Sequence, residues 1–381
     1  MLNKILPKKY KDNEKLIDFI FSHLSSKRLL AIIQYNKKYK QIYKDYMKIE
    51  IDIYPMENKY FTFINVPRES KDFFHIFFDD SEQEIKNIYE IKYKNKIKKI
   101  KIIIDPEFKK INKIFTNQMY INQIDFVKFN RRDIEDFSNM FKGCKCLQEI
   151  NMAKLITNNA TNMNSMFDEC SSIVELNLSN FVTDKVNDMS YMFSNCSSLR
   201  EIILSKFSTS NVSNMAYMFR GCRDLNEINL TGFDTKNVQD MDSMFRECST
   251  LVELNLNSFV TEKVFDMSNM FSDCTSLKTI KISKFNSPNL QKIKYMFSGC
   301  STLKHLDLSA LKTDNFNEMQ YMFQNCESLQ FLNIVNIRLN YCLNNTDIFD
   351  GCESLKELKC SDPNIKEQFE QLLIKNKTAN N

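Results

Sequence analysis

The chain has 381 residues, of which 43% are hydrophobic, so it can bury a sizeable core and could hold two or three ordinary domains. It contains only 5 Gly and 6 Pro, which excludes long flexible linkers and glycine-rich phosphate loops as organising features. The net charge of +4 is uneven: residues 1–110 carry 24 Lys+Arg against 16 Asp+Glu (+8), which leaves 28 against 32 (−4) for the remainder. A basic block can contact nucleic acid or lipid, but solvated lysines explain it more simply, and no nucleic-acid partner is expected.

The N-terminus has no pattern typical of export. Its first twenty residues lack a long apolar run and are interrupted by Lys4, Lys8, Lys9, Lys11 and Lys15. No stretch approaches the roughly 20 apolar residues that a membrane span needs. The sequence therefore predicts an intracellular, cytoplasmic protein whose thiols stay reduced.

Residues 14–44 have the apolar spacing of two or three short helices, and part of this segment is similar to the F-box. The similarity lies in Leu16-Ile-Asp-Phe-Ile-Phe-Ser-His-Leu24, Arg28-Leu-Leu30, Tyr35-Asn-Lys37 and Tyr39. F-boxes followed by leucine-rich repeats are adaptors in ubiquitin ligation, so the resemblance implies a Skp1-type adaptor as a partner. The residues that would contact it are Ile20, Phe21, Leu24, Leu29 and Leu30. The alternative is a helical leader that shields the first repeat.

The rest of the region 1–96 mixes strands with short helices. Residues 48–54 alternate between polar and apolar side chains, which predicts a half-buried strand. Residues 60–64 predict a second strand, whereas 70–78 and 82–91 are predicted to be helical. The whole region is expected to form a mixed α/β N-terminal cap.

Residues 97–362 contain one 26-residue pattern, repeated about eleven times. Nine cysteines recur at this step and are called the cysteine column: Cys144, Cys170, Cys196, Cys222, Cys248, Cys274, Cys300, Cys326 and Cys352. A leucine or isoleucine stands three residues after each cysteine. The pair before the cysteine is Met-Phe eight times, as in Met140-Phe141, and Ile348-Phe349 in the last unit. Two degenerate units come first, one with Gln118 in the cysteine column and one that begins at Ile97. Repetition at this scale predicts a solenoid.

Each unit has a strand part and a turn part. Two apolar residues that alternate after the cysteine predict a short strand. The segment Met-x2-Met-Phe-x2-Cys has spacings of three and four, which predicts a helical turn with one buried face. Asp188 and its equivalents stand immediately before that turn, where an N-cap accepts amide hydrogens. Stacked units bury each other's apolar edges, so the predicted fold is an α/β, leucine-rich-repeat-like solenoid of 24–26-residue turns with a parallel strand ladder.

The repeat unit resembles a known family. Phe233-Asp-Thr-Lys-Asn-Val238, followed by Met241-Asp-Ser-Met-Phe245, is similar to the 26-residue repeat of bacterial surface proteins, a BspA-type branch of the leucine-rich-repeat class. The resemblance implies a solenoid with an interaction role and no catalytic residue. Members of this family are mostly exported or lipid-anchored, so a cell-surface adhesin or host-interaction protein is a further alternative, against which the absent export signal counts.

Several columns of the repeat are predicted to be structural. The cysteine column is expected to be a ladder of buried free thiols, because the neighbouring leucine and methionine columns mark it as core. Neither a zinc site nor any other metal or cofactor site is expected, since C-x2-C pairs are absent. The hydroxyls of the threonine column are expected to bond to neighbouring backbone and to one another along the ladder. The column consists of Thr157, Thr183, Thr209, Thr235, Thr261, Ser287 and Thr313.

The outward strand positions are the candidate partner-binding face. One glutamate per turn forms the glutamate column: Glu149, Glu175, Glu201, Glu227 and Glu253. Beside it lie Asn177, Asn229 and Asn255, and the same column continues to His305 and Phe331. Stacked glutamates repel one another and the core does not require them, so a cationic partner segment would suit this face. A solvated face copied by repeat duplication is the alternative.

Past the repeats, Ile365, Phe369, Leu372 and Leu373 have helical spacing, and residues 363–381 are predicted to be a helical C-terminal cap. The chain has only three histidines and no arranged nucleophile and base, so it is predicted not to be an enzyme. The expected function is a non-enzymatic repeat scaffold that binds a protein partner on its strand face, with the F-box-type adaptor as the first alternative.

Overall fold

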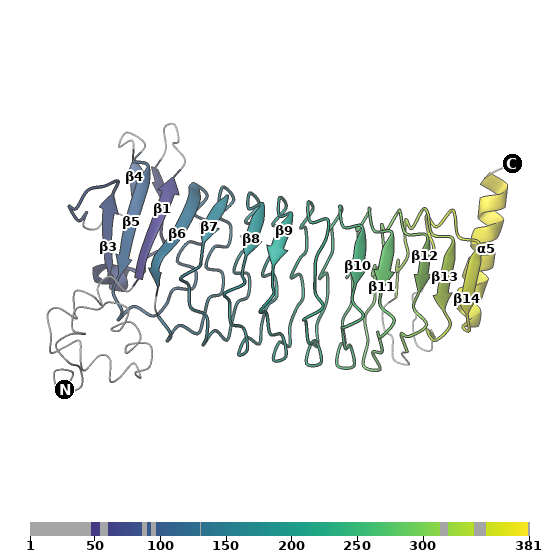
Figure 1. Cartoon of the computed structure of the whole chain (residues 1–381). Helices are drawn as coiled ribbons and strands as arrows, with labels where there is room; N and C mark the ends of the chain where they lie inside the picture. Colours follow the sequence, from purple (N-terminus) through teal and green to yellow (C-terminus); the bar gives the residue numbers. More distant parts are fainter. Residues whose placement is uncertain are drawn as a thin grey trace.

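The computed structural model shows an elongated solenoid, with a sheet at one end and helix α5 at the other (Figure 1). It describes residues 47–53, 60–85, 90–92, 97–129, 131–312, 319–338 and 348–379. The F-box-like segment 14–44 and Thr313 lie outside the described residues.

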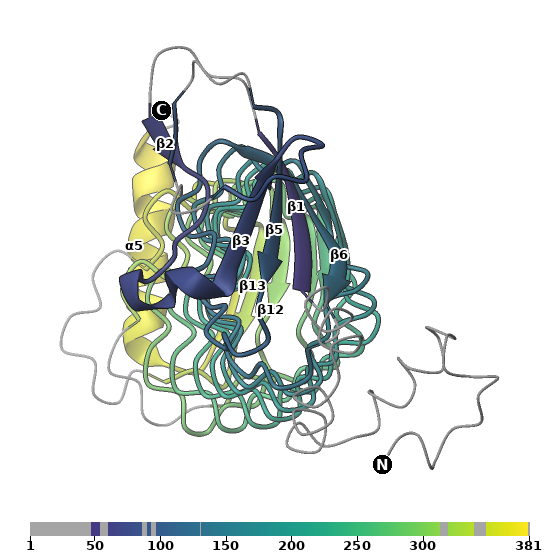
Figure 2. The same cartoon turned by 90° about the vertical axis from the view of Figure 1, so that its left-hand side faces the viewer.

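The N-terminal end is a five-stranded sheet. Its order is β3 (Phe74–Phe78), β5 (Lys99–Ile104), β1 (Met47–Ile53), β6 (Ile121–Phe129) and β7 (Glu149–Asn151). Strand β1 lies between β5 and β6 and is antiparallel to both, whereas β6 and β7 are parallel. The sheet therefore changes from antiparallel to parallel at β6, where the solenoid begins, and Figure 2 views the stack from this end.

Of three segments predicted in the N-terminal cap, two are confirmed by the structure and one is wrong. The strand predicted at 48–54 is confirmed as β1, and the strand predicted at 60–64 as β2 (Tyr60–Thr62), which pairs with β4 (Glu90–Lys92). The helix predicted at 70–78 is wrong. Its first residues belong to the 3-10 helix η2 (Arg68–Phe73), and the rest form strand β3. A strand forms there because Phe74, Ile76 and Phe78 alternate along the chain, which places the first two in the core.

The number of turns is smaller than predicted. The unit that begins at Ile97 was expected to open the parallel ladder, but its strand β5 pairs antiparallel with β1 and β3. Because β1 is inserted between β5 and β6, that unit cannot stack its strand on the next. The nine turns of the cysteine column are preceded by the Gln118 unit, whose strand β6 pairs parallel with β7 and whose Phe115 ring stacks on Phe141. The count in the described residues is therefore slightly smaller than the eleven or so that were predicted.

The strand side of the solenoid carries short parallel strands in separate groups. They are β8 (Glu175–Asn177), β9 (Glu201–Ile203), β10 (Glu253–Asn255), β11 (Thr279–Lys281), β12 (His305–Asp307), β13 (Phe331–Ile334) and β14 (Glu357–Cys360). Strand β8 pairs with β9, β10 with β11, and β12 with β13 and then β14. The parallel pairing is confirmed, but the strand ladder is interrupted within the described residues.

The turn side, formed by the Met-Phe segments, is bonded without interruption. The N–H of each phenylalanine donates to the carbonyl of the methionine, or finally Ile348, of the next turn, at 2.9 to 3.2 Å, from Phe115 to Phe323. The predicted helical turn is wrong here, because an α-helix would direct these N–H groups into its own turn. Left-handed residues at two positions per turn, such as Asn139 and Gly143, instead turn alternate N–H groups toward the neighbouring turn. The predicted cap is present in a related form: the Ser190 N–H donates to Asp188 Oδ1 at 2.9 Å.

The phenylalanine rings and the cysteine thiols form one continuous core column. Ten rings from Phe115 to Phe349 stack with centroids 5.1 to 6.2 Å apart. Every column thiol is buried and donates to the carbonyl of the phenylalanine 29 residues before it, as Cys170 does to Phe141 at 3.1 Å. The predicted buried thiol ladder is confirmed.

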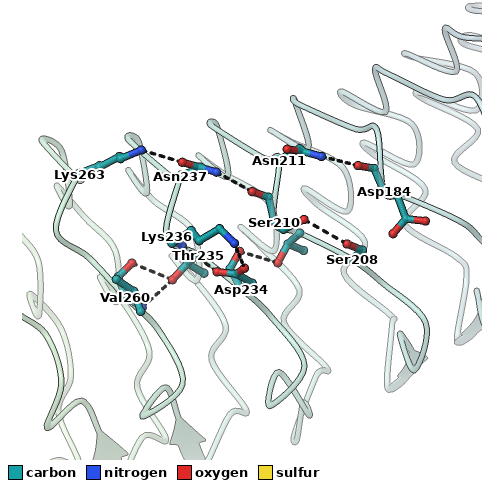
Figure 3. Close-up of polar contacts among 11 residues, drawn as sticks. Asp184, Ser208, Ser210, Asn211, Asp234, Thr235, Lys236, Asn237, Val260 and Lys263 are labelled. Carbon is teal, nitrogen blue, oxygen red and sulfur yellow. Dashed lines mark hydrogen bonds and ion pairs between the residues drawn. The ribbon is translucent and has the colours of Figure 1, made fainter.

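The threonine column joins turns at the edge between the two sides (Figure 3). Thr235 is fully buried; its hydroxyl donates to the Val260 carbonyl and accepts from the Val260 N–H, both at 2.8 Å. Next to it, Asn237 donates to the Ser210 carbonyl at 2.7 Å and accepts from Lys263 at 2.7 Å. Thr157, Thr183 and Thr209 likewise donate to a backbone carbonyl of the next turn, whereas the Ser287 hydroxyl donates to that of Thr261 at 2.8 Å. The predicted structural role is therefore confirmed for these members.

The far end is closed by α5 (Pro363–Ala379). Ile365 is fully buried, and Phe369 meets Phe349, the last ring of the stack, edge to face at 6.4 Å. Asp362 caps the helix by accepting from the N–H of Asn364 at 2.9 Å. The predicted helical C-terminal cap is confirmed.

We expect the folded chain to lose stability as the pH rises above about 9, because column thiols ionise in the unfolded chain but stay protonated in the core. Burial raises the pKa of Cys144 and Cys274 from 9.0 to about 12, so their contribution is complete below pH 9 and is lost between pH 9 and 12. Each such thiol then costs about 1.4 kcal/mol per pH unit. Urea unfolding at about pH 8 and about pH 10 measures the effect. Replacing Cys222 and Cys248 by alanine should make the pH dependence shallower, and an unchanged slope would contradict this reading.

Replacing Thr235 by valine should lower the free energy of unfolding by about 1–3 kcal/mol, because the hydroxyl of this fully buried residue is the partner of both the N–H and the carbonyl of Val260. The matched control is Thr231→Val, which removes an exposed hydroxyl that bonds only to Asn229 in the described network. Chemical denaturation of both variants measures the free energy of unfolding. An equal decrease in the two variants would show that the Thr235 hydroxyl contributes no more to stability than the exposed one.

Candidate functional site on the strand side

The short strands point alternate residues inward and outward, and this alternation builds the candidate site. In β8 and β10 the central leucine is buried, while the flanking glutamate and asparagine are exposed. Glu175 lies directly opposite Glu201 in the parallel register, and Glu253 lies opposite Thr279. The glutamates therefore form a line along the solenoid, spaced by the separation of neighbouring strands, about 4.8 Å.

The structure brings the predicted face residues onto one side of the molecule. All five members of the glutamate column are exposed, as are Asn177, Asn229, Asn255 and His305, while Phe331 is half-buried. His305 lies opposite Phe331 across β12 and β13, with ring centroids 6.4 Å apart. The asparagines also have a structural role, since Asn177 and Asn229 each accept the N–H two residues further on. Ile20, Phe21, Leu24, Leu29 and Leu30, the possible adaptor-binding residues, lie outside the described residues.

The glutamate column has no neutralising partner among the described ion pairs. The nearest arginine in sequence, Arg200, pairs with Asp224 at 3.6 Å instead. The same side continues to Asp125, whose pKa is raised by burial and then by repulsion from Glu50, its register partner in β1. Toward the other end the character changes: Lys281 follows in β11, and the Lys359 ammonium lies 5.3 Å from the centre of the Phe331 ring. The strand side is therefore acidic in its first half and mixed or basic in its second.

Sequence reasoning missed a second set of residues, the tyrosines on the turn side. Tyr191 and Tyr217 stack at 4.4 Å and 3°, and Tyr295 and Tyr321 stack at 4.9 Å and 8°. All four have a left-handed backbone with φ between 56° and 61°, a conformation that costs a bulky residue roughly 1–2 kcal/mol. Burial, and then the hydrogen bond with Asp242, raise the pKa of Tyr217. The sequence does contain a signal, because a tyrosine stands directly before four of the Met-Phe pairs. It is hard to recognise because the adjacent methionine and phenylalanine positions belong to the core.

Two features of the described residues concern metal binding and thiol chemistry. No group of three or more His, Cys, Asp and Glu side chains in these ranges could hold a metal ion. Burial raises the pKa of the column thiols Cys170, Cys196, Cys222, Cys248 and Cys300, which keeps them in the unreactive protonated form. Among the helices of these ranges, none is long and apolar enough to cross a membrane.

The fold and its repeat define a leucine-rich-repeat-like solenoid. Residues 108–227, 161–280 and 251–361 each match the family described as "Mycoplasma protein of unknown function, DUF285". The matches together cover residues 108–361, or 254 of 381, so the chain belongs to the DUF285 family. No match is found among the curated proteins.

Three solved structures match part of this chain at low sequence identity. A leucine rich cell surface protein from Faecalibacterium prausnitzii A2-165 is 16% identical over 65% of this chain and 75% of its own, with a TM-score of 0.32. The T. pallidum Leucine Rich Repeat protein is 18% identical over 66% and 88%, with a TM-score of 0.28. A leucine-rich repeat protein from Eubacterium ventriosum is 12% identical over 68% and 79%, with a TM-score of 0.27.

We expect Glu175→Gln to raise the free energy of unfolding by a few tenths of a kcal/mol at low salt, because it removes one of two like charges that lie opposite each other. Glu357→Gln is the matched control, since this exposed glutamate has Phe331 as its register partner. Denaturant melts at about 0.01 M and about 1 M salt should show the gain only at the lower concentration. A gain of the same size in both variants would mean that cross-strand repulsion is not its source.

Proposed function

We propose that this chain is a non-enzymatic, protein-binding repeat scaffold and that the glutamate column is where its partner docks. The observation that carries the proposal is the row of five exposed glutamates, one per turn, none of which has an ion-pair partner among the described residues. The core does not need these carboxylates, and their stacking works against folding. A partner with positive charges would remove that repulsion and gain from complementarity.

The spacing of the column favours a particular kind of partner. Successive glutamates lie about 4.8 Å apart along the solenoid, and successive turns of an α-helix lie about 5.4 Å apart. A helix lying along the column can therefore present one lysine or arginine per turn to each glutamate over a few turns. The partner proposed for this face is a basic amphipathic helix of another protein, and the asparagines beside the column would bond to its polar side chains.

The F-box-type adaptor remains the second candidate, because the segment 14–44 is similar to that motif in sequence. It predicts that a Skp1-type adaptor is retained by the intact chain and lost when residues 1–45 are removed. If other proteins are retained by both forms and no such adaptor is found, this segment serves as a leader only. The cytoplasmic location stays a prediction in either case.

The docking proposal predicts that replacing Glu175, Glu201 and Glu227 by glutamine weakens binding of a labelled lysine-rich helical peptide by about tenfold at low salt. The control replaces the exposed Glu135, Asp184 and Glu262, which lie outside the strand face, by their amides, so that the net charge changes equally. Fluorescence anisotropy measures both. Equal weakening by the two triple variants would indicate diffuse attraction, and no saturable binding of the unmodified chain would sink the proposal.

A further inference from the structure

The turn side carries a compact group of aromatic and basic side chains, the Tyr–Arg patch, distinct from the glutamate column. It consists of Tyr191, Tyr217, Arg220, Arg223, Arg246 and Glu247. These residues belong to three consecutive turns and flank the Met-Phe segments, whereas the glutamates lie on the strands. The inward-facing core columns separate the two surfaces.

The arginines outnumber the acidic group that holds them. The Glu247 carboxylate forms ion pairs with Arg223, Arg220 and Arg246, whose nearest nitrogen atoms lie 2.7, 3.6 and 3.7 Å from its oxygens. Three guanidinium groups therefore share one carboxylate. The Nε atoms of Arg220 and Arg246 are hidden from solvent without a hydrogen-bond partner in the described structure. Asp242 lies close by, but it accepts from the Ser243 hydroxyl at 2.9 Å and from the Tyr217 hydroxyl. The patch therefore has a local excess of positive charge.

The tyrosines next to these arginines are held in place at a conformational cost. Tyr191 and Tyr217 have φ of 58° and 61°, in the left-handed region that bulky residues avoid. Asn139 and Asn269 occupy the same position in other turns, and asparagine adopts the left-handed conformation at lower cost. The two rings stack and are half-buried, with the Arg220 guanidinium 5.8 Å from the centre of the Tyr217 ring. Strained residues that the backbone does not require are a mark of functional surfaces.

We infer that the Tyr–Arg patch is a second docking surface, which binds an acidic segment of a protein partner. Carboxylates of that segment would pair with the exposed guanidinium edges of Arg220, Arg223 and Arg246, whose side chains are 32%, 62% and 35% exposed. An apolar or aromatic side chain between the carboxylates would pack beside the tyrosine stack. Tyrosine and arginine are also the residue types that contribute most at protein interfaces. Charge complementarity selects this occupant, in contrast to the basic partner proposed for the strand side.

The test uses a labelled peptide in which two phenylalanines stand between two runs of five glutamates. Arg220→Gln with Arg246→Gln should weaken its binding about tenfold at low salt, whereas Lys278→Gln with Lys304→Gln, which removes two exposed charges from the strand side, should leave it unchanged. Equal weakening by both pairs, or no saturable binding by the intact chain, overturns the inference. Neither result bears on the lysine-rich peptide, so the two docking surfaces can fail separately.

A second pair of measurements separates docking from stability and from other polyanions. The double variant Tyr191→Asn with Tyr217→Asn should bind the peptide more weakly. Its melting temperature should not fall, because asparagine tolerates the left-handed backbone. A lower melting temperature with unchanged binding would assign the tyrosines to the fold and overturn their part in docking. A labelled single-stranded oligothymidine is the competing probe. If it binds more tightly than the peptide and depends on the same arginines, the patch takes nucleic acid and the inference is wrong.

Discussion

The carbonyl group of each repeat phenylalanine is the point at which consecutive turns are joined in the core. The Phe141 carbonyl accepts the N–H of Cys144, in its own turn, at 3.0 Å and the Sγ of Cys170, in the next turn, at 3.1 Å. Its N–H meanwhile donates to Met166, and its ring stacks on Phe167 at 5.3 Å. Cysteine suits the site because it is a small hydrophobic residue with a weak donor, so the carbonyl gains a second partner without a strongly polar group entering the core.

This joint explains why the nine cysteines recur at a strict 26-residue step. Ring, carbonyl and thiol of one turn must meet their counterparts in the next, so an insertion inside a turn would displace every contact of the column at once. The strand side has no such requirement. Residues 227–229 form no assigned strand between β9 and β10, and Ile203 occupies a position where other turns have asparagine. Bonding on the turn side keeps the stack in register there, which leaves the outward strand positions free to vary.

The sequence predicted the inward-facing residues because each leaves a periodic, chemically uniform column. Cys170, Phe167 and Thr183 recur with little change in neighbouring turns, and burial and hydrogen bonding explain why. Spacing alone could not show how the backbone is bonded. Spacings of three and four fit an α-helix, and nothing in the local pattern indicates that Asn139 or Tyr191 is left-handed. The insertion of β1 between β5 and β6 depends on contacts between segments about 50 and 70 residues apart, which no local periodicity reveals.

For the candidate surfaces, comparing the turns with one another is more informative than any single residue. The glutamate column occupies five successive turns, so duplication of an ancestral repeat can account for its regularity as well as function can. Tyrosine precedes the Met-Phe pair in four turns, so duplication can account for its presence, although the left-handed backbone favours the asparagine found there in other turns. Arginine follows the pair in only two turns, as Arg220 and Arg246, where other turns carry lysine, serine, aspartate or glutamine. The arginines of the Tyr–Arg patch thus depart from the repeat, and its tyrosines depart from the local conformational preference.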